Sequence, residues 1–126
     1  MDTAILVDEL NNNAIALLKA LDKREFIFTI AALTKSPEGE DWRLTLGIPE
    51  LRKRGSRDSL IKIDNVITEE NLEISLSDIK LIDDQDGLFN LLRLQFHTGK
   101  EIERIFFNGN YLKGQRIPDS IIYRVN

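Results

Sequence analysis

The chain has 126 residues, of which 42% are hydrophobic and 30% are charged, and its formal net charge is −4. This length and composition predict a soluble globular protein with a single domain, residues 1–126. The absence of cysteine excludes a disulfide scaffold, a cysteine-ligated zinc site, an iron–sulfur cluster and a thiol nucleophile, and it is typical of a reducing compartment.

The N-terminal sequence MDTAILVDELNNN lacks the features of a signal peptide or a membrane span. No basic stretch precedes its apolar run, and that run, Ala4 to Val7, is much shorter than either kind of segment requires. We therefore expect a cytoplasmic protein that makes no membrane contact.

The first predicted element is an amphipathic helix. Apolar side chains within residues 4–21 recur at the spacing of three and four that gives a helix one apolar face. Asp2 or Thr3 can cap its N-terminus, and Lys23 lies where the helix dipole favours a cation. The pattern predicts that the helix ends near Asp22.

A β-hairpin is predicted next, because the period of the pattern changes to two. Side chains alternate over residues 26–31 and again over residues 42–48. The sequence KSPEGE, residues 35–40, lies between these runs and contains the proline and glycine typical of a turn.

The middle of the chain predicts a helical turn or short loop followed by two more strands. Pro49 can begin such a turn and Gly55 can end it. The β-branched residues of 59–67 favour a strand. In residues 71–83 the apolar positions change phase at Ser77–Asp78, which predicts a β-bulge that leaves Leu76 and Ile79 on the same side of the sheet.

The C-terminal third predicts further strands joined by short turns. The expected strands are residues 88–97, 102–107 and 121–125. The expected turns are DDQDG at 83–87, TGK at 98–100 and NGN at 108–110. Because the last strand ends the sequence uncovered, we expect either a closing barrel or a pairing partner there, which makes a homodimer a reasonable expectation.

These elements predict an α+β fold. The N-terminal helix packs on a strongly curved, mostly antiparallel sheet of about six to eight strands, which forms a roll or a partly open barrel. The connections are too short for parallel βαβ crossovers, which need a dozen or more residues. The expected core consists of large apolar side chains: Leu10, Leu17, Leu21, Phe26, Phe28, Trp42, Leu44, Leu76, Leu94 and Phe96.

No catalytic, cofactor or metal site is predicted. The sequence contains neither G-x-S-x-G nor a glycine-rich phosphate loop. The single histidine, His97, has no orienting partner in any motif, and its phase predicts a position facing solvent or a polar groove. The DDQDG turn does not fit a calcium loop, since Ile82 and Arg93 would occupy two of the ligand positions.

The basic segment LRKRGSR, residues 51–57, is the sharpest feature of the chain. Residues 51–62 carry a net charge of +4, and residues 63–92 carry −7. Like charges repel, so the segment is predicted to be an exposed, mobile loop. Its candidate contact residues are Arg52, Lys53, Arg54, Ser56 and Arg57.

The favoured function is a non-catalytic, cytoplasmic binding or accessory module that engages a protein partner or itself. One alternative is a nucleic-acid- or phosphate-associated protein that uses residues 51–57, where arginine and backbone amides could bind a phosphate. Another alternative is a small hydrolase-like enzyme with a carboxylate site. The net charge of −4 argues against a protein dedicated to nonspecific duplex binding.

Overall fold

The computed structural model describes residues 3–35, 41–107, 110–112, 115–117 and 119–126. In these residues the helices are α1 (Thr3–Lys23), α2 (Leu51–Arg54), α3 (Arg57–Glu69) and α4 (Gly87–Gln95), with a 3₁₀ helix η1 (Leu76–Asp78). The strands are β1 (Ile30–Lys35), β2 (Trp42–Ile48), β3 (Ile79–Asp83), β4 (Ile105–Phe107), β5 (Asn110–Leu112), β6 (Gln115–Ile117) and β7 (Ser120–Val125).

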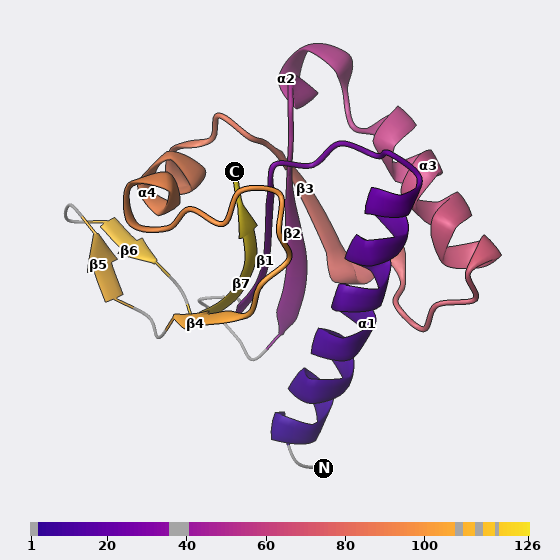
Figure 1. Cartoon of the computed structure of the whole chain (residues 1–126), viewed down its shortest axis with the longest axis horizontal. Helices are drawn as coiled ribbons and strands as arrows, with labels where there is room; N and C mark the ends of the chain where they lie inside the picture. Colours follow the sequence, from indigo (N-terminus) through magenta and orange to yellow (C-terminus); the bar gives the residue numbers. More distant parts are fainter. Residues whose placement is uncertain (1–2, 36–40, 108–109, 113–114, 118) are drawn as a thin grey trace.

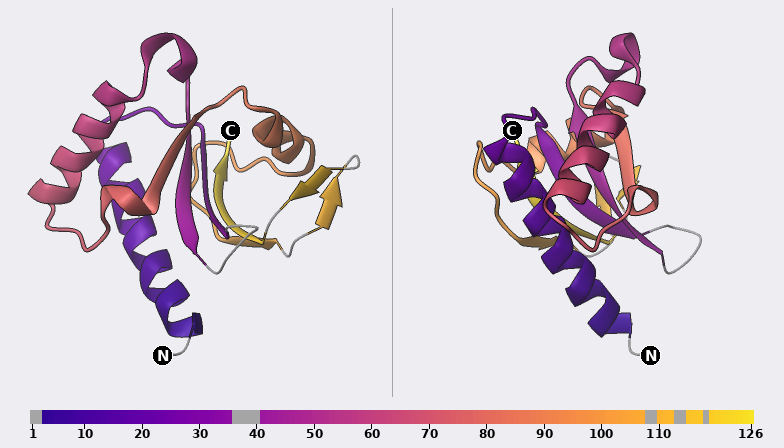
Figure 2. Two further views of the ribbon diagram at one scale, coloured as in Figure 1. Left: turned by 180° about the vertical axis from the view of Figure 1, so that it is seen from behind. Right: turned by 90° about the vertical axis from the view of Figure 1, so that its right-hand side faces the viewer.

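The fold is α+β, with an open mixed sheet between two layers of helices. Within the described residues the sheet has five strands in the order β3-β2-β1-β7-β4, and β5 pairs with β6 in a separate ribbon. The β2–β3 pair is parallel, and the pairs β1–β2, β1–β7 and β4–β7 are antiparallel. Helices α1 and α3 lie on one side of the sheet and α4 lies on the other (Figure 1, Figure 2).

Each face of the sheet has its own core. Along β1, Ala31 and Leu33 pack in the core that contains α1 and α3, and Ile30 and Ala32 pack in the core that contains α4. Residues 30–33 of β1 are therefore buried on both faces, which explains why they are all apolar.

Several predictions are confirmed. Helix α1 ends at Lys23, one residue after the predicted end. The hairpin is present, and β2 has the predicted bounds, although β1 begins at Ile30 rather than at residue 26. A single helical turn, α2, occupies residues 51–54 and is followed by Gly55. The KSPEGE turn falls largely on residues 36–40 and the NGN turn on residues 108–109, outside the described part of the chain.

Two predicted strands are wrong, since residues 59–67 belong to α3 and residues 88–97 largely to α4. In α3 the buried residues Ile63 and Val66 are three apart, and in α4 Phe89 and Leu92 have the same spacing. A spacing of three places both side chains on one helical face, and this burial outweighs the preference of β-branched residues for strands.

The roll or barrel and its predicted number of strands are not confirmed, because the five-stranded sheet does not close. The exclusion of a parallel crossover is also wrong. It depended on a strand at 59–67, whereas this segment is the helix that connects β2 to the parallel strand β3. The last strand, β7, is not an edge strand, since it pairs with β1 and β4. The edge argument for a homodimer therefore does not apply to it.

The predicted bulge at Ser77–Asp78 is a 3₁₀ turn instead. Ser75 and Asp78 form a capping box, in which the Ser75 amide donates to Asp78 Oδ2 at 3.1 Å. This hydrogen-bonded turn shifts the apolar phase as a bulge would. A register shift does occur elsewhere, between β1 and β7 at Ala31 and Ala32.

The predicted core is largely but not entirely correct. Four of its members are buried: Leu17, Leu21, Phe28 and Leu44. Five are half-buried: Leu10, Phe26, Trp42, Leu76 and Phe96. Leu94 is 66% exposed, because it lies in α4 on the side away from Phe89 and Leu92.

Two polar contacts, one buried and one partly buried, fix α1 to the sheet. The hydroxyl of Tyr123 donates to Asn11 Oδ1 at 2.6 Å, and burial raises the pKa of this hydroxyl above its usual value. Near the end of α1, the buried guanidinium of Arg124 donates to both carboxylate oxygens of Asp22, at 2.9 and 2.6 Å, and lies 4.4 Å from the ring centre of Phe28. These contacts set the position from which the chain leaves α1.

Candidate functional site

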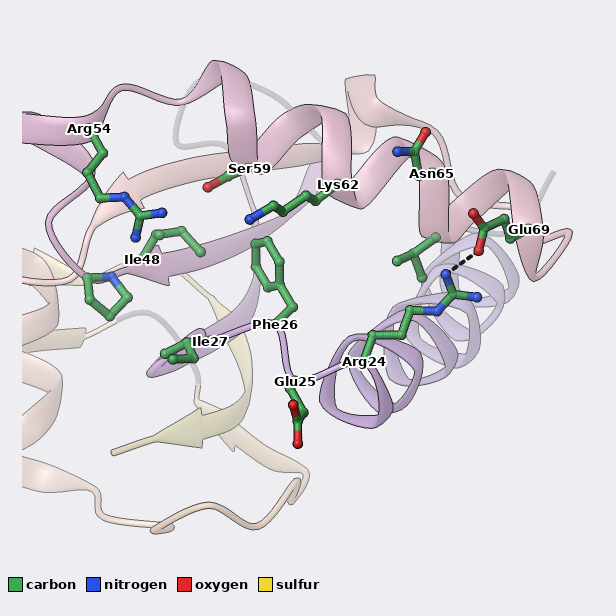
Figure 3. A pocket seen from close by; sticks show the side chains of 12 residues that line it. Arg24, Glu25, Phe26, Ile27, Ile48, Arg54, Ser59, Lys62, Asn65 and Glu69 are labelled. Carbon is green, nitrogen blue, oxygen red and sulfur yellow. Dashed lines mark hydrogen bonds and ion pairs between the residues drawn. The ribbon is translucent and has the colours of Figure 1, made fainter.

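A cleft of about 460 Å³ lies beside the end of α1. Its walls come from three segments: residues 24–27 after α1, residues 48–54 from the end of β2 to the end of α2, and residues 59–69 of α3. Figure 3 shows the side chains that line it. Its apolar lining is Phe26, Ile27, Ile48, Pro49 and Val66, and its polar lining is Arg24, Glu25, Arg54, Ser59, Lys62, Asn65 and Glu69.

The wall formed by residues 24–27 is shaped by the way α1 ends. The amide of Phe26 donates to the carbonyl of Leu21 at 2.9 Å, and the amide of Glu25 donates to that of Asp22 at 3.0 Å. This pair of bonds is a Schellman motif, and Glu25 takes its left-handed position with φ 59°. The reversal leaves the side chain of Ile27 70% exposed at the cleft.

The α2 wall is held by a buried carboxylate at the end of β3. Asp83 Oδ2 accepts a hydrogen bond from the amide of Arg52 at 3.0 Å, and Oδ1 accepts one from the amide of Gln85 at 2.9 Å. These bonds, first that of Arg52 and then that of Gln85, lower the pKa of Asp83. Glu50, with φ 58°, turns the chain into α2, and its carbonyl accepts from the amide of Arg54 at 3.0 Å.

The cationic side chains of the cleft differ in whether they are paired. Arg24 forms ion pairs with Glu69 and Glu70, the second at 3.1 Å. Arg54 and Lys62, by contrast, form no ion pair within the described part of the chain. Their cationic ends lie over the apolar side of the cleft in Figure 3, whereas the Glu25 carboxylate points away from it. Two unpaired positive charges thus border an apolar surface.

The predicted contact residues are all exposed, as expected for a basic segment, and they lie on α2, at the start of α3 and in the link between these helices. Arg52, Lys53 and Arg54 are on α2, and Arg57 begins α3, so the segment is helical rather than a loop. Among them only Arg54 lines the cleft, and the amide of Arg52 is bound to Asp83. Ser56 precedes α3 and makes no side-chain cap hydrogen bond.

Sequence reasoning missed Lys62, Phe26 and Ile27 as site residues. The strand expected at residues 59–67 contains Lys62, which on helix α3 faces the same cleft as Ser59, three residues earlier. The strand expected at residues 26–31 contains Phe26 and Ile27. The predicted end of the helix near Asp22 places both residues outside the helix, but no pattern in the sequence indicates that their side chains line a cleft.

The DDQDG segment forms a turn, as predicted, but it leads into α4 rather than a hairpin. Asp84 is buried and accepts a hydrogen bond from the hydroxyl of Thr29 at 2.9 Å. Among the described residues no three histidine, aspartate or glutamate side chains are grouped so that they could hold a metal ion. His97 is exposed.

No family model, curated protein or solved structure matches the chain. None of the helices in the described residues combines the length and the apolarity that a membrane crossing requires.

Proposed function

We propose that this protein is a non-catalytic cytoplasmic accessory module that engages a protein partner through the cleft between residues 24–27 and α3. The observation that carries the proposal is Ile27, which is 70% exposed in a cleft that also contains the half-buried Phe26. Burying one such side chain contributes about 1.5–3 kcal/mol. A partner that covers Ile27 gains this free energy, and the fold of the protein alone does not.

The chemistry of the lining supports binding over catalysis. It includes one hydroxyl, that of Ser59, which makes no hydrogen bond to a base among the described residues. A serine nucleophile needs such a base within hydrogen-bond reach. The Glu69 carboxylate is already paired with Arg24, so it is poorly placed to act as a general base.

Photo-crosslinking in the cells that make the protein tests the proposal. The photoreactive residue p-benzoylphenylalanine replaces Ile27 in one variant and Ile61 in a matched control. Ile61 is 49% exposed on α3 but does not line the cleft. We expect a protein adduct of defined mass from position 27 and none from position 61. Equal adducts at both positions would contradict the proposal, and an adduct of twice the chain mass would identify a second copy as the partner.

The nucleic-acid alternative has less support, because Arg54 is the one cation of residues 51–57 that lines the cleft. It is tested by fluorescence anisotropy with single- and double-stranded DNA and RNA at low salt. We expect no measurable binding. Binding that weakens steeply with salt, and weakens further when the basic side chains become glutamine, would favour the alternative. The residues to replace are Arg52, Lys53, Arg54 and Arg57.

A further inference from the structure

We infer that the cleft binds an acidic segment of a partner protein, in which carboxylates flank a bulky apolar side chain. This inference rests on the proposed function and names the chemistry of the partner. Carboxylates would meet Arg54 and Lys62, and the apolar side chain would cover Ile27 and Phe26.

The charge of the cleft points to an acidic ligand, although the chain as a whole is acidic. Glu69 is ion-paired with Arg24, which also pairs with Glu70, and Glu25 is directed away from the cleft (Figure 3). Arg54 and Lys62 have no carboxylate partner within the described residues. A partner carboxylate can therefore pair with either cation without displacing an ion pair already present. Complementary charges of this kind select acidic partners and speed their association.

The apolar surface indicates a protein segment rather than a small molecule. Sites for small molecules usually enclose most of the ligand surface. Here Ile27 is 70% exposed, so a ligand has to extend over the edge of the cleft to cover it. Peptide segments use such clefts by inserting one or two apolar anchors while polar side chains contact the rim.

Short fluorescein-labelled peptides provide the direct test, with anisotropy as the readout. The first peptide combines glutamate with leucine and phenylalanine. In the second lysine replaces every glutamate, and in the third serine replaces every apolar residue. We expect the first to bind about tenfold or more tighter than either of the others, and to weaken several-fold between low and moderate salt.

Matched variants locate the binding site. Ile27→Asp should weaken the first peptide by about tenfold or more, and Ile61→Asp should leave its affinity unchanged. Arg54→Glu with Lys62→Glu should weaken it to a similar extent. The same double change at Lys53 and Arg57, which are exposed but do not line the cleft, should have little effect. Circular dichroism and thermal unfolding confirm that each variant is folded.

The double variant Arg54→Glu, Lys62→Glu also provides a reciprocal test, since it should bind the lysine peptide more tightly than the unaltered protein does. Equal affinity for the acidic and basic peptides, or equal losses from the cleft variants and their controls, would overturn the inference. If position 27 still crosslinks to a protein, the proposed function stands without the inference that the partner segment is acidic. Binding of decanoate but of none of the peptides would also overturn the inference, in favour of a small amphiphile.

Discussion

Replacing Gly47 by alanine tests the contact between β2 and α4, which separates this fold from a sheet with a strand at residues 88–97. Gly47 lies within β2 on the face that α4 covers. A Cβ atom at this position would lie 2.8 Å from Phe89 Cε2 and 3.0 Å from Ile30 Cβ. Phe89 and Ile30 are both buried, at 1% and 0% exposure, so neither has free space into which it can move.

The expected magnitude follows from two opposing contributions. Inserting a methylene into a packed core costs about 1–3 kcal/mol. Alanine is better suited than glycine to a strand interior by about 0.5–1 kcal/mol. Gly47→Ala should therefore lower the free energy of unfolding by about 0.5–2 kcal/mol. At about 4 °C per kcal/mol for a chain of this length, Tm should fall by about 2–8 °C.

Urea unfolding of a double-mutant cycle measures the contact itself. Phe89→Leu alone removes buried ring atoms and should cost about 1–2 kcal/mol. In the double variant the shorter side chain makes room for the new methyl group, so the combined loss should be about 1 kcal/mol smaller than the sum of the single losses. Gly87→Ala is the matched control, because a Cβ atom there meets no atom within 4 Å. A neutral Gly47→Ala with an additive cycle would show that Phe89 does not cover Gly47.

Three further predictions concern single residues. Tyr123→Phe leaves the buried Asn11 carbonyl oxygen without its 2.6 Å hydrogen bond and should lower the free energy of unfolding by about 1–2 kcal/mol in urea; an unchanged value would contradict this. Glu25→Gly should raise the free energy of unfolding by up to about 1 kcal/mol. A non-glycine residue with positive φ is strained by about 1–2 kcal/mol, and removing this strain is partly offset because glycine loses more conformational entropy on folding. The folded-state pKa of Asp83 is lowered, so its contribution to stability is complete above its unfolded pKa, about 3.9, and is lost as pH falls through the folded value. The free energy of unfolding of Asp83→Asn should consequently fall less steeply with decreasing pH in that range than that of the unaltered protein. Equally steep falls in both proteins would show that the pKa of Asp83 is not lowered by folding.

The elements that could be predicted are those whose apolar pattern agrees with their intrinsic preference. In α1 the helical apolar pattern extends over residues 4–21, and its buried residues Ala14, Leu17 and Leu18 favour helix. In β2 the alternating apolar pattern and the flanking turn residues both favour a strand. In α3 the apolar spacing and the intrinsic preference of the residues disagree, because isoleucine and valine favour strands while Ile63 and Val66 are spaced for a helix. Tertiary packing decides such a case.

The chain does contain a pattern that would have corrected the error at residues 88–97. Residues 30–33 and 121–123 are apolar in both phases of the strand period, which indicates strands buried on both faces. A single N-terminal helix can cover only one face of a sheet. A second apolar layer is therefore required on the opposite face, and in this structure α4 provides it through Phe89 and Leu92. Burial on two faces is a property of the whole sheet, so no single segment reveals it.

The wrong prediction of a strand at residues 59–67 explains why the sequence predicts only part of the candidate site. A strand at residues 59–67 would place Lys62 and Ser59 on opposite faces, because their spacing is odd. On a helix that spacing brings both to one face, and both line the cleft with Arg54. Of the four cations that are close in sequence, Arg54 lines the cleft and the other three do not, whereas Arg54 and Lys62, eight positions apart, share it. The density of charge along the chain is a poor guide to a binding surface when the charges lie on helices, since the helical period decides which of them face the same side.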